Sequence, residues 1–358
     1  MGDNVENMIR RVSVSPEMSI KESLRKIDES GIGNLFVCGH DGELLGSLTD
    51  GDVRRRILET GDLMEPIERC YNRNPVYLNE GRYDIQKVRS LMLEKTIEAL
   101  PVVDETKKIV KILFWKEVFQ GEKVFREKID VPVVIMAGGK GKRLDPFTRI
   151  LPKPLIPIGE KPMIEVIVDN FVRQGAEKFF VTLNFKGDMI KLYFDSIEKN
   201  YKLGYIREDE FLGTAGSLKL LPADIGERFI VSNCDVIVKA EYKDLIKFHD
   251  KNKNLLTVAG AIHYHKIPYG VIRFGKDGKI QSIQEKPELD LTVNSGVYVV
   301  SKEAVELIPE GKRFDMTDLI QALLSAEKNV GVYPVMQSNY IDVGQWEEYK
   351  NHINELGI

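Results

Sequence analysis

The 358-residue sequence has little cysteine and little net charge, and both shortages exclude classes of protein. Its three cysteines, Cys38, Cys70 and Cys234, are widely spaced and form no CxxC motif or His/Cys cluster. We therefore expect neither a disulfide framework nor a structural zinc site. The formal net charge of −4 comes from 51 basic and 55 acidic residues, so the sequence predicts no nucleic-acid partner.

The sequence also lacks long apolar runs. No segment approaches the roughly 18 apolar residues that a membrane-spanning helix needs. The N-terminus has acids and amides where a signal peptide would have basic and apolar residues. These absences predict a cytoplasmic protein without a membrane partner. Hydrophobic residues make up 43% and charged residues 30%, which is typical of globular proteins, and the length favours two domains.

The first third of the chain contains an internal repeat. Residues 32–53 align without a gap on residues 97–118, and both segments predict a strand, a polar turn, a second strand and the start of a helix. The turns are expected at 39–43 and 104–108. One copy is too small to bury much apolar surface by itself, so we expect the two copies to pack together.

The repeat resembles a tandem pair of CBS domains, an α+β module, over residues 1–120. The first copy would span about 8–62 and the second about 63–120. The matching motif is GSLTDGD at 46–52. Residues 121–130 are charged and lack a strong pattern, so we predict a linker there.

The CBS resemblance implies an adenine or other nucleotide bound through the hydroxyl group of Thr49 and the carboxylate of Asp52. In the second copy, Phe114 and Glu117 occupy these positions, which puts a second nucleotide site in doubt. An N-cap of the following helix is the alternative role for Thr49 and Asp52.

A glycine-rich loop opens the remaining part of the chain, 131–358. The apolar run at 131–137 predicts a buried strand, and the loop GGKGKRL follows it at 138–144. Glycines let backbone N–H groups approach an anion closely. No GK[ST] closes the loop, so it is not a Walker loop. Leu144 takes the third glycine position of a dinucleotide fingerprint, which disfavours a dehydrogenase.

The longer string MAGGKGKRLDPFTRILPKPLIPIGEKPMIE, at 136–165, closely resembles the signature of the sugar-1-phosphate nucleotidyltransferases. In that family GGxGxRLxPxT is followed by PKPL. The resemblance continues almost to the C-terminus and implies an α/β fold: a Rossmann-like, GT-A-like domain with a mixed sheet, preceded here by the CBS pair.

The resemblance also implies roles for individual residues. Arg143 would contact the triphosphate, and Lys153 would contact phosphate in the transition state. Asp235 and Asp342 would hold Mg²⁺, which prefers a few hard carboxylates. From the residues alone, Arg143 could be a surface ion-pair residue, Lys153 a solvated loop lysine, and each acid a cap or turn residue. The nucleotide would further lie against Ala137, Gly138, Gly139, Gly141, Glu208 and Gly213.

Three later stretches match the sugar-binding half of the family. Gly270 would lie beside the sugar, Glu285 would bind sugar hydroxyls, and Lys286 would bind the sugar phosphate. Asn294 lies on a further strand that contacts the sugar. An exposed ion pair on a strand edge is the alternative for Glu285 and Lys286.

Two other patterns are predicted to be structural. His263 and His265 would share one face of a strand. They are expected to be surface histidines, because the sequence offers no third zinc ligand nearby. Asp315 or Thr317 is expected to be the N-cap of a helix.

The choice of base is predicted from Glu208. This residue lies five positions before the glycine of LGT, where uridylyl and thymidylyl members commonly have glutamine. A carboxylate only accepts hydrogen bonds, and guanine offers two adjacent donors, whereas uracil offers one donor between two carbonyls. Glu208 therefore favours GTP. The E…LGTAG pattern is also typical of mannose-1-phosphate guanylyltransferases.

Together these features predict Mg²⁺-dependent transfer of a nucleoside monophosphate, from GTP or another NTP, to a sugar 1-phosphate of the glucosamine or mannose type. The domain arrangement is similar to that of the glucosamine-1-phosphate guanylyltransferases of legionaminic acid biosynthesis. The alternatives are a uridylyl- or cytidylyltransferase on a related sugar phosphate, and a nucleotide-sensing protein with an inactive transferase domain. A homo-oligomer, dimer or larger, is expected, with the CBS pair as a dimer-forming or regulatory module.

Overall fold

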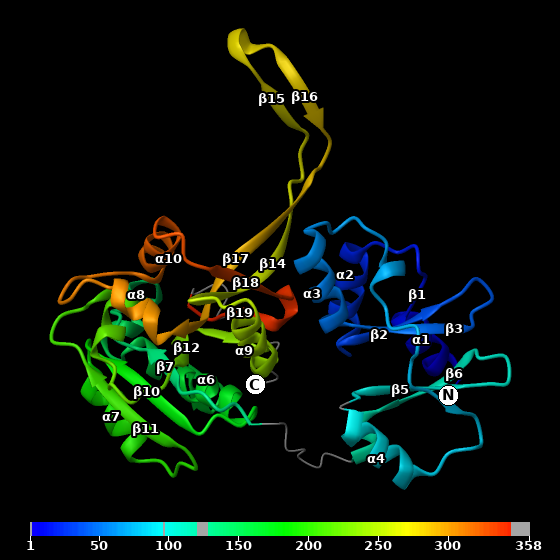
Figure 1. Cartoon of the computed structure of the whole chain (residues 1–358), viewed down its shortest axis with the longest axis horizontal. Helices are drawn as coiled ribbons and strands as arrows, with labels where there is room; N and C mark the ends of the chain where they lie inside the picture. The colour runs from blue at the N-terminus through cyan, green and yellow to red at the C-terminus, as the bar shows by residue number, and fades with distance from the viewer. Residues whose placement is uncertain (1, 96, 120–127, 345–358) are drawn as a thin grey trace. The chain divides into compact units, whose positions relative to one another are not determined.

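The computed structural model describes residues 2–95, 97–119 and 128–344. The chain divides into two compact units, Met1–Val124 and Phe125–Ile358 (Figure 1). The predicted linker at 121–130 lies mostly outside the described residues. Within its described end, Ile129 is buried in the core of the second unit. No helix in the described ranges is long and apolar enough to cross a membrane.

The sequence repeat of the first unit is also a structural repeat. Strands β2 and β3 pair antiparallel and lead into α3, and β5, β6 and α5 recur 65 positions later with the same register shift near the turn. The predicted turns at 39–43 and 104–108 are therefore correct. The elements are α1 (Gly2–Val12), β1 (Ser13–Val14), α2 (Ile20–Ser30), β2 (Asn34–Cys38), β3 (Leu44–Thr49), α3 (Asp50–Thr60), η1 (Ile67–Arg69), β4 (Leu78–Asn79), α4 (Ile85–Lys95), β5 (Ala99–Val103), β6 (Ile109–Phe114) and α5 (Trp115–Phe119).

The two copies meet at equivalent positions. Glu43 and Lys108 form an antiparallel bridge, and the backbone N–H of Leu44 donates to the carbonyl of Lys107 at 2.9 Å. Glu43 and Lys108 occupy equivalent positions in the two copies. Their antiparallel bridge therefore relates the copies locally by an approximate two-fold axis. The two copies therefore contact each other through the turns that join their strands.

The second unit is built on a seven-stranded sheet of order β11-β10-β7-β12-β17-β14-β18. Its first half is parallel, whereas β17 runs antiparallel to both of its neighbours, so the sheet is mixed. The strands are β7 (Val133–Met136), β10 (Lys178–Leu183), β11 (Lys202–Arg207), β12 (Arg228–Asn233), β14 (Leu256–Lys266), β17 (Glu288–Ser301) and β18 (Val330–Val335).

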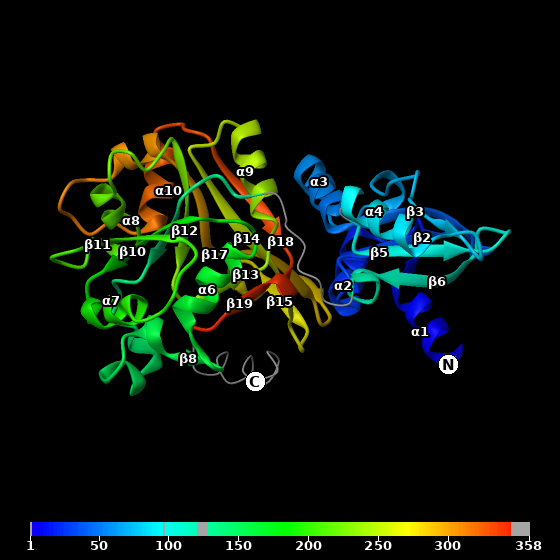
Figure 2. The same cartoon turned by 90° about the horizontal axis from the view of Figure 1, so that it is seen from below.

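Both faces of this sheet are covered, which explains the continuous apolar run of β7. Val133 and Ile135 point into one core and Val134 and Met136 into the other. Figure 2 shows α6 and α7 on one side of the sheet and α8 and α10 on the opposite side. The helices are α6 (Met163–Val172), α7 (Gly187–Asp195), α8 (Gly213–Gly216), α9 (Tyr242–Lys251) and α10 (Met316–Ser325). The predicted α/β fold with a mixed, Rossmann-like sheet is confirmed.

An arm extends from the long strands β14 and β17 (Figure 1). Its end is a ribbon of two strands, β15 and β16, which pair only with each other among the described strands. The remaining short elements are η2 (Lys142–Leu144), η3 (Phe147–Arg149), η4 (Lys153–Leu155), β8 (Pro157–Ile158), β9 (Lys161–Pro162), η5 (Ser217–Leu220), β13 (Val236–Val238), β15 (Val271–Phe274), η6 (Lys276–Gly278), β16 (Ile280–Gln284), η7 (Lys302–Leu307), η8 (Gln337–Asn339) and β19 (Tyr340–Asp342).

Candidate active site

The glycine-rich loop follows β7 and folds back against Lys153. Gly141 has a left-handed conformation with φ 63° and begins the turn η2. A Cβ atom added to Gly141 would lie 2.7 Å from the Cβ atom of Lys153, so only glycine lets the loop approach this closely. At the start of the loop, the N–H of Ala137 donates to the hydroxyl group of Thr182 at 3.1 Å. Gly138, Gly139 and Gly141 therefore form one short segment beside a predicted catalytic cation.

Two predicted cations converge on one acid. Lys153 is only 6% exposed, and its ammonium group forms an ion pair with Asp235. The guanidinium group of Arg143 lies 3.6 Å from the same carboxylate. The side chain of Arg143 is 65% exposed, which leaves it accessible to a bound anion.

Asp235 and Asp342 come together through strand pairing. Asp235 lies between β12 and β13, and β13 pairs antiparallel with β19, where Val236 stands opposite Asp342. A Cβ atom added to Gly344 would lie 2.5 Å from Asp235 Oδ2, 2.8 Å from Lys153 Nζ and 2.9 Å from Asp342 Oδ1. The two carboxylates and the ammonium group therefore surround one small space.

This pair of acids fits Mg²⁺. Within the described ranges, no group of three or more His, Cys, Asp or Glu side chains could hold a metal ion. Mg²⁺ is commonly held by one or two carboxylates together with water and substrate phosphates, and it prefers hard oxygen donors. Asp235 and Asp342 would supply those donors. His265 is exposed, as predicted for a surface histidine, whereas His263 is half-buried and its ring packs edge-on against Tyr340 at 5.6 Å, so the prediction of surface histidines holds only at His265.

Glu208 lies beside the glycine loop, and the sequence did not predict how deeply it is buried. Its side chain is 3% exposed, and Oε2 accepts a hydrogen bond from the N–H of Leu212 at 3.0 Å. A Cβ atom added to Gly138 would lie 2.7 Å from Oε1. Burial raises the pKa of the Glu208 carboxyl group. Glu208 therefore stabilises the turn that leads to Gly213 through its bond to Leu212, and it also contacts the glycine loop at Gly138.

Gly213 has a packing role. Its φ is +84°, and an added Cβ atom would lie 2.6 Å from the carbonyl oxygen of Phe314. The neighbouring N–H of Thr214 donates to Asp315 Oδ1 at 3.0 Å. Asp315 is the N-cap of α10 in a capping box with Asp318, so the cap predicted at Asp315 or Thr317 is at Asp315.

The side chains predicted to bind the sugar lie in two places. On β17, Asn294 accepts a hydrogen bond from the N–H of Gly296 at 3.0 Å, and an added Cβ atom on Gly296 would lie 2.5 Å from the side chain of Asn233. Asn294 is therefore connected to the strand that leads into Asp235.

The other three residues predicted to bind the sugar or its phosphate lie toward the arm. Gly270 lies beside Glu285, since its added Cβ atom would be 3.0 Å from Glu285 Oε2. The stretch of β17 from Glu288 to Asn294 covers roughly 20 Å at ~3.3 Å per residue, and Glu285 and Lys286 lie beyond its outer end. The structure therefore does not bring them to the two acids.

In the first unit, Thr49 is the N-cap of α3. Its hydroxyl group accepts from the N–H of Asp52 at 3.2 Å, and Asp52 Oδ2 accepts from the N–H of Thr49 at 2.9 Å. Asp52 also pairs with Arg55. In the second copy, Glu117 accepts from the N–H of Phe114 at 3.4 Å, so half of this capping box recurs. The cap role is present, and nucleotide binding at Thr49 and Asp52 stays a prediction.

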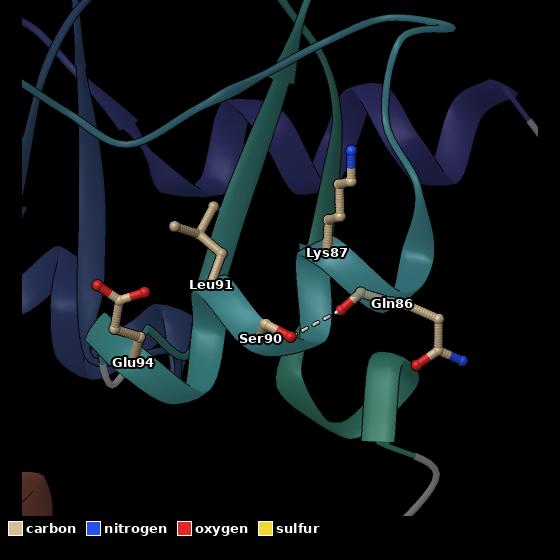
Figure 3. A pocket seen from close by; sticks show the side chains of 5 residues that line it. All are labelled: Gln86, Lys87, Ser90, Leu91 and Glu94. Atoms are coloured by element: carbon tan, nitrogen blue, oxygen red, sulfur yellow. Dashed lines mark hydrogen bonds between the residues drawn. The ribbon is translucent and has the colours of Figure 1, made fainter.

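A shallow hollow in the first unit is lined by one helix. Figure 3 shows that its side chains spread away from α4, and its one drawn bond joins the Ser90 hydroxyl group to the Gln86 carbonyl at 3.2 Å. The lining residues are Gln86, Lys87, Ser90, Leu91 and Glu94. Because these groups do not converge, the hollow provides no argument for a ligand.

Comparison with known proteins identifies the families to which the two units are similar. Residues 132–357 match the nucleotidyl transferase family, and residues 4–59 and 67–120 match the CBS domain. A UTP–glucose-1-phosphate uridylyltransferase from Synechocystis sp. is 27% identical over 237 residues, which cover 60% of this chain and 61% of that protein. A mannose-1-phosphate guanyltransferase from Yarrowia lipolytica is 30% identical over 231 residues, with the same two coverages.

The solved structure of HddC from Yersinia pseudotuberculosis is similar with a TM-score of 0.51 and 28% identity, and the match covers 63% of this chain and 99% of that one. The chain spans about half to three-fifths of the length of the curated relatives it matches. The family match covers more than half of this chain. The resemblance read from the sequence is thus confirmed: the chain belongs to the nucleotidyl transferase family and carries a tandem pair of CBS domains.

Proposed function

We propose that the second unit transfers a nucleoside monophosphate from a nucleoside triphosphate to a sugar 1-phosphate and releases pyrophosphate. The observation that carries this proposal is the convergence of Arg143, Lys153, Asp235 and Asp342 beside the glycine loop. Two cations, two hard carboxylates and a loop of small residues are what a reaction between two phosphate groups requires.

The nucleophile in this reaction needs no activation by the protein. A phosphate oxygen of the sugar phosphate is already anionic at pH 7, so the residues of the site have to align two anions and offset their repulsion. The backbone of the glycine loop would hold the triphosphate, and the exposed guanidinium group of Arg143 would contact it. Lys153, held by its two flanking prolines, would contact the phosphoryl group as charge develops on it.

We propose Mg²⁺ as the cofactor, held by Asp235 and Asp342. Arg143 and Lys153 bring two positive charges and the acids bring two negative charges, so the four side chains have no formal net charge. Bound Mg²⁺ would supply the positive charge that attracts and screens the phosphates. The ion pair of Lys153 with Asp235 would keep the ammonium group near the metal and the reacting phosphorus.

We propose GTP as the nucleotide. Glu208 supports it, because its acceptor oxygens suit the two donors of guanine, and the similarity to a mannose-1-phosphate guanyltransferase points the same way. In the structure Oε2 accepts from the Leu212 N–H and Oε1 lies against Gly138, so both oxygens would have to turn from these contacts to meet the two donors of guanine. A uridylyl- or cytidylyltransferase remains the second proposal, supported by the similarity to a uridylyltransferase.

For the sugar we propose glucosamine 1-phosphate or mannose 1-phosphate. The CBS pair ahead of a short transferase unit supports the glucosamine form and a place in legionaminic acid biosynthesis. The arm that carries Gly270, Glu285 and Lys286 would have to bend toward Asn294 for these side chains to reach the same sugar phosphate.

The decisive experiment is a matrix of four NTPs against a panel of sugar 1-phosphates with Mg²⁺, read as pyrophosphate release by the full-length protein. We expect turnover with GTP and glucosamine 1-phosphate or mannose 1-phosphate. Turnover with UTP alone would overturn the guanine proposal. Silence across the panel would favour the nucleotide-sensing alternative.

The remaining proposals concern partners. We propose that the first unit binds an adenine nucleotide at Thr49 and Asp52, and that the protein is a homo-oligomer. Exposed apolar side chains on the ribbon of β15 and β16 support the second proposal, because a two-stranded ribbon is marginally stable without a cover. Isothermal titration with AMP and ATP tests the first, using Thr49→Asn, which keeps a capping oxygen and removes the hydroxyl group; binding that Thr49→Asn leaves unchanged would contradict it. The cytoplasmic location stays a prediction.

A further inference from the structure

A three-residue segment outside the predicted site contacts the start of the glycine-rich loop 138–144, called the phosphate loop below, and the residues that follow this loop. Residues 184–186 connect β10 to α7. The N–H of Phe185 donates to the carbonyl of Gly138 at 3.3 Å, at the start of the loop. The ammonium group of Lys186 donates to three carbonyls after the loop, those of residues 148–150, at 3.4, 2.6 and 2.9 Å. The segment therefore spans the two ends of the stretch from 138 to 150.

An ammonium group suits this position chemically. The turn η3 ends at Arg149, and the carbonyls at the end of such a turn point outward without partners inside the turn. Lysine offers three donors, one for each of the three carbonyls. None of these acceptors has a formal charge, so the bonds fix the positive charge of Lys186 without cancelling it.

The backbone of Lys186 adds a second observation. Its φ is +53° and its ψ is +29°, a left-handed conformation that is uncommon outside glycine and asparagine. Such residues cost of order 1–3 kcal/mol and persist where the surroundings determine them. The side chain bonds to the three carbonyls, and its ammonium group lies 5.2 Å from the centroid of the Phe185 ring; these contacts hold lysine here.

The segment at 148–150 transmits this restraint to the catalytic lysine. Thr148 is 5% exposed, and an added Cβ atom on Gly141 would lie 3.0 Å from Thr148 Cγ2 and 2.7 Å from Lys153 Cβ. Gly141, Thr148 and Lys153 are therefore packed against one another. A displacement of 148–150 would move the surface on which both the loop and Lys153 rest.

We propose that Lys186 is a positioning residue that holds the phosphate loop closed against Lys153. It acts through the backbone at 148–150 and does not itself touch the reacting groups. This inference rests on the proposed function for its catalytic consequence, whereas its structural part stands on the bonds described above.

The test is hydrogen exchange in the nucleotide-free, full-length protein. Lys186→Met removes the donors and keeps the side-chain length. We expect amide exchange to become about tenfold faster at Leu144, Ile150 and Leu151, whose N–H groups bond within the loop and η3, with little change in β12. Lys186→Arg, which keeps a cation and its donors, should restore the slow exchange. The matched control is Lys191→Met, since Lys191 lies on α7, the helix that follows Lys186, is exposed and pairs with Asp195.

Unchanged exchange at 144–151 in Lys186→Met would overturn the proposal, and so would an equal increase throughout the unit. If Lys186→Met does not fold, Lys186→Asn takes its place, because asparagine tolerates the left-handed conformation and lacks the ammonium group.

Activity gives the second readout. We expect kcat/KM for the triphosphate to fall about 10- to 100-fold in Lys186→Met, because displacement of a positioned group by about 1 Å costs up to ~100-fold. Lys186→Arg should recover most of it, and Lys191→Met should match the wild type. A wild-type protein that is silent on every substrate would contradict the proposed function, while the exchange data would still decide the role of Lys186.

Discussion

Lys153 and Asp235 form an ion pair although 82 positions separate them in the sequence. Their side chains are only 8% and 12% exposed, so water screens the pair weakly. Arg143 lies 3.6 Å from the same carboxylate. One acid therefore holds a buried cation with a proposed catalytic role and is also a proposed metal ligand, so the stability of the unit and its proposed chemistry depend on the same side chains.

The first prediction concerns this pair. Lys153→Met should lower the free energy of unfolding by about 3 kcal/mol, because it leaves a nearly buried carboxylate with weaker compensation. The double variant Lys153→Met/Asp235→Asn should lose clearly less than the sum of the two single variants. Urea unfolding without Mg²⁺ measures the free energy of unfolding of the two single variants and of the double variant.

The exposed pair Lys191 and Asp195 is the control for this cycle. Its coupling energy should be about 0.5 kcal/mol or less, as is usual for surface pairs. Additive losses at Lys153 and Asp235 would contradict the prediction.

The second prediction concerns Gly344. Gly344→Ala would place a methyl group among Asp235, Lys153 and Asp342, so pyrophosphate release should fall by at least ~100-fold. Gly311→Ala is the comparison, because no heavy atom lies within 4 Å of its added Cβ atom; its φ of +64° strains alanine, so this variant also controls for general strain outside the site. Equal activity in the two variants would show that the three side chains do not act together.

The third prediction is a pH dependence caused by Glu208. Burial raises the pKa of this carboxyl group above its ordinary value of 4.5. Between the unfolded and the raised native pKa the folded protein binds more protons, so its stability falls as pH rises through that window. Glutamine stays neutral and can still accept from the Leu212 N–H.

Glu208→Gln should therefore gain stability relative to the wild type as pH rises from 4 to 7. Urea unfolding at several pH values measures this difference, with the exposed Glu210→Gln as control. A constant difference between Glu208→Gln and the wild type would exclude the effect.

The fourth prediction concerns His249. This residue is 2% exposed and bonds to the hydroxyl groups of Thr257 and Ser301 at 2.9 Å each. Burial lowers its pKa from 6.5 to about 4. Below pH 6.5 the unfolded chain takes up the proton first, so stability should fall as pH drops toward 4, by on the order of 3 kcal/mol. His249→Gln should be less stable at pH 7 but should lose less on acidification, and parallel pH profiles would count against it.

The fifth prediction concerns the ribbon. Ile272 stands opposite Ile283 and Phe274 opposite Ile280, so the four side chains share one face, and each is 49% to 70% exposed. If a second copy covers this face, Ile272→Thr/Ile283→Thr should lower the mass measured by light scattering. Arg273→Thr/Ser282→Thr alters the opposite face and should not. A monomeric wild-type protein would refute the oligomer.

Much of the fold could be predicted because its signals are local. The repeat at 32–53 and 97–118 placed both turns correctly, since glycines, acids and lysines interrupt apolar strands at equivalent positions. The apolar run before Gly138 predicted a buried strand for the same reason. Asp235 and Asp342 could be connected only through the family resemblance, because the pairing of β13 with β19 joins distant segments and leaves no spacing pattern.

The features that the sequence did not predict depend on contacts that are not marked by particular residue types. Lys186 bonds to backbone carbonyls, which every residue has, so nothing in the sequence identified its acceptors. Glu208 was interpreted as a base reader, but its burial and its bond to Leu212 arise from the fold of the following turn. Similarly, the sequence motif around Glu285 does not reveal that the strands continue outward as an arm.

The pairing of β13 with β19 also sets an order of events during synthesis. The glycine loop, Lys153 and Asp235 leave the ribosome before Asp342 does, and translation at ~5–20 residues per second separates the two acids by roughly 5 to 20 seconds. During that interval Lys153 and Arg143, the ion-pair partners of Asp235 in the folded structure, are already synthesised, whereas Asp342 is not. A nascent chain therefore cannot assemble the two-carboxylate centre until β19 has paired with β13.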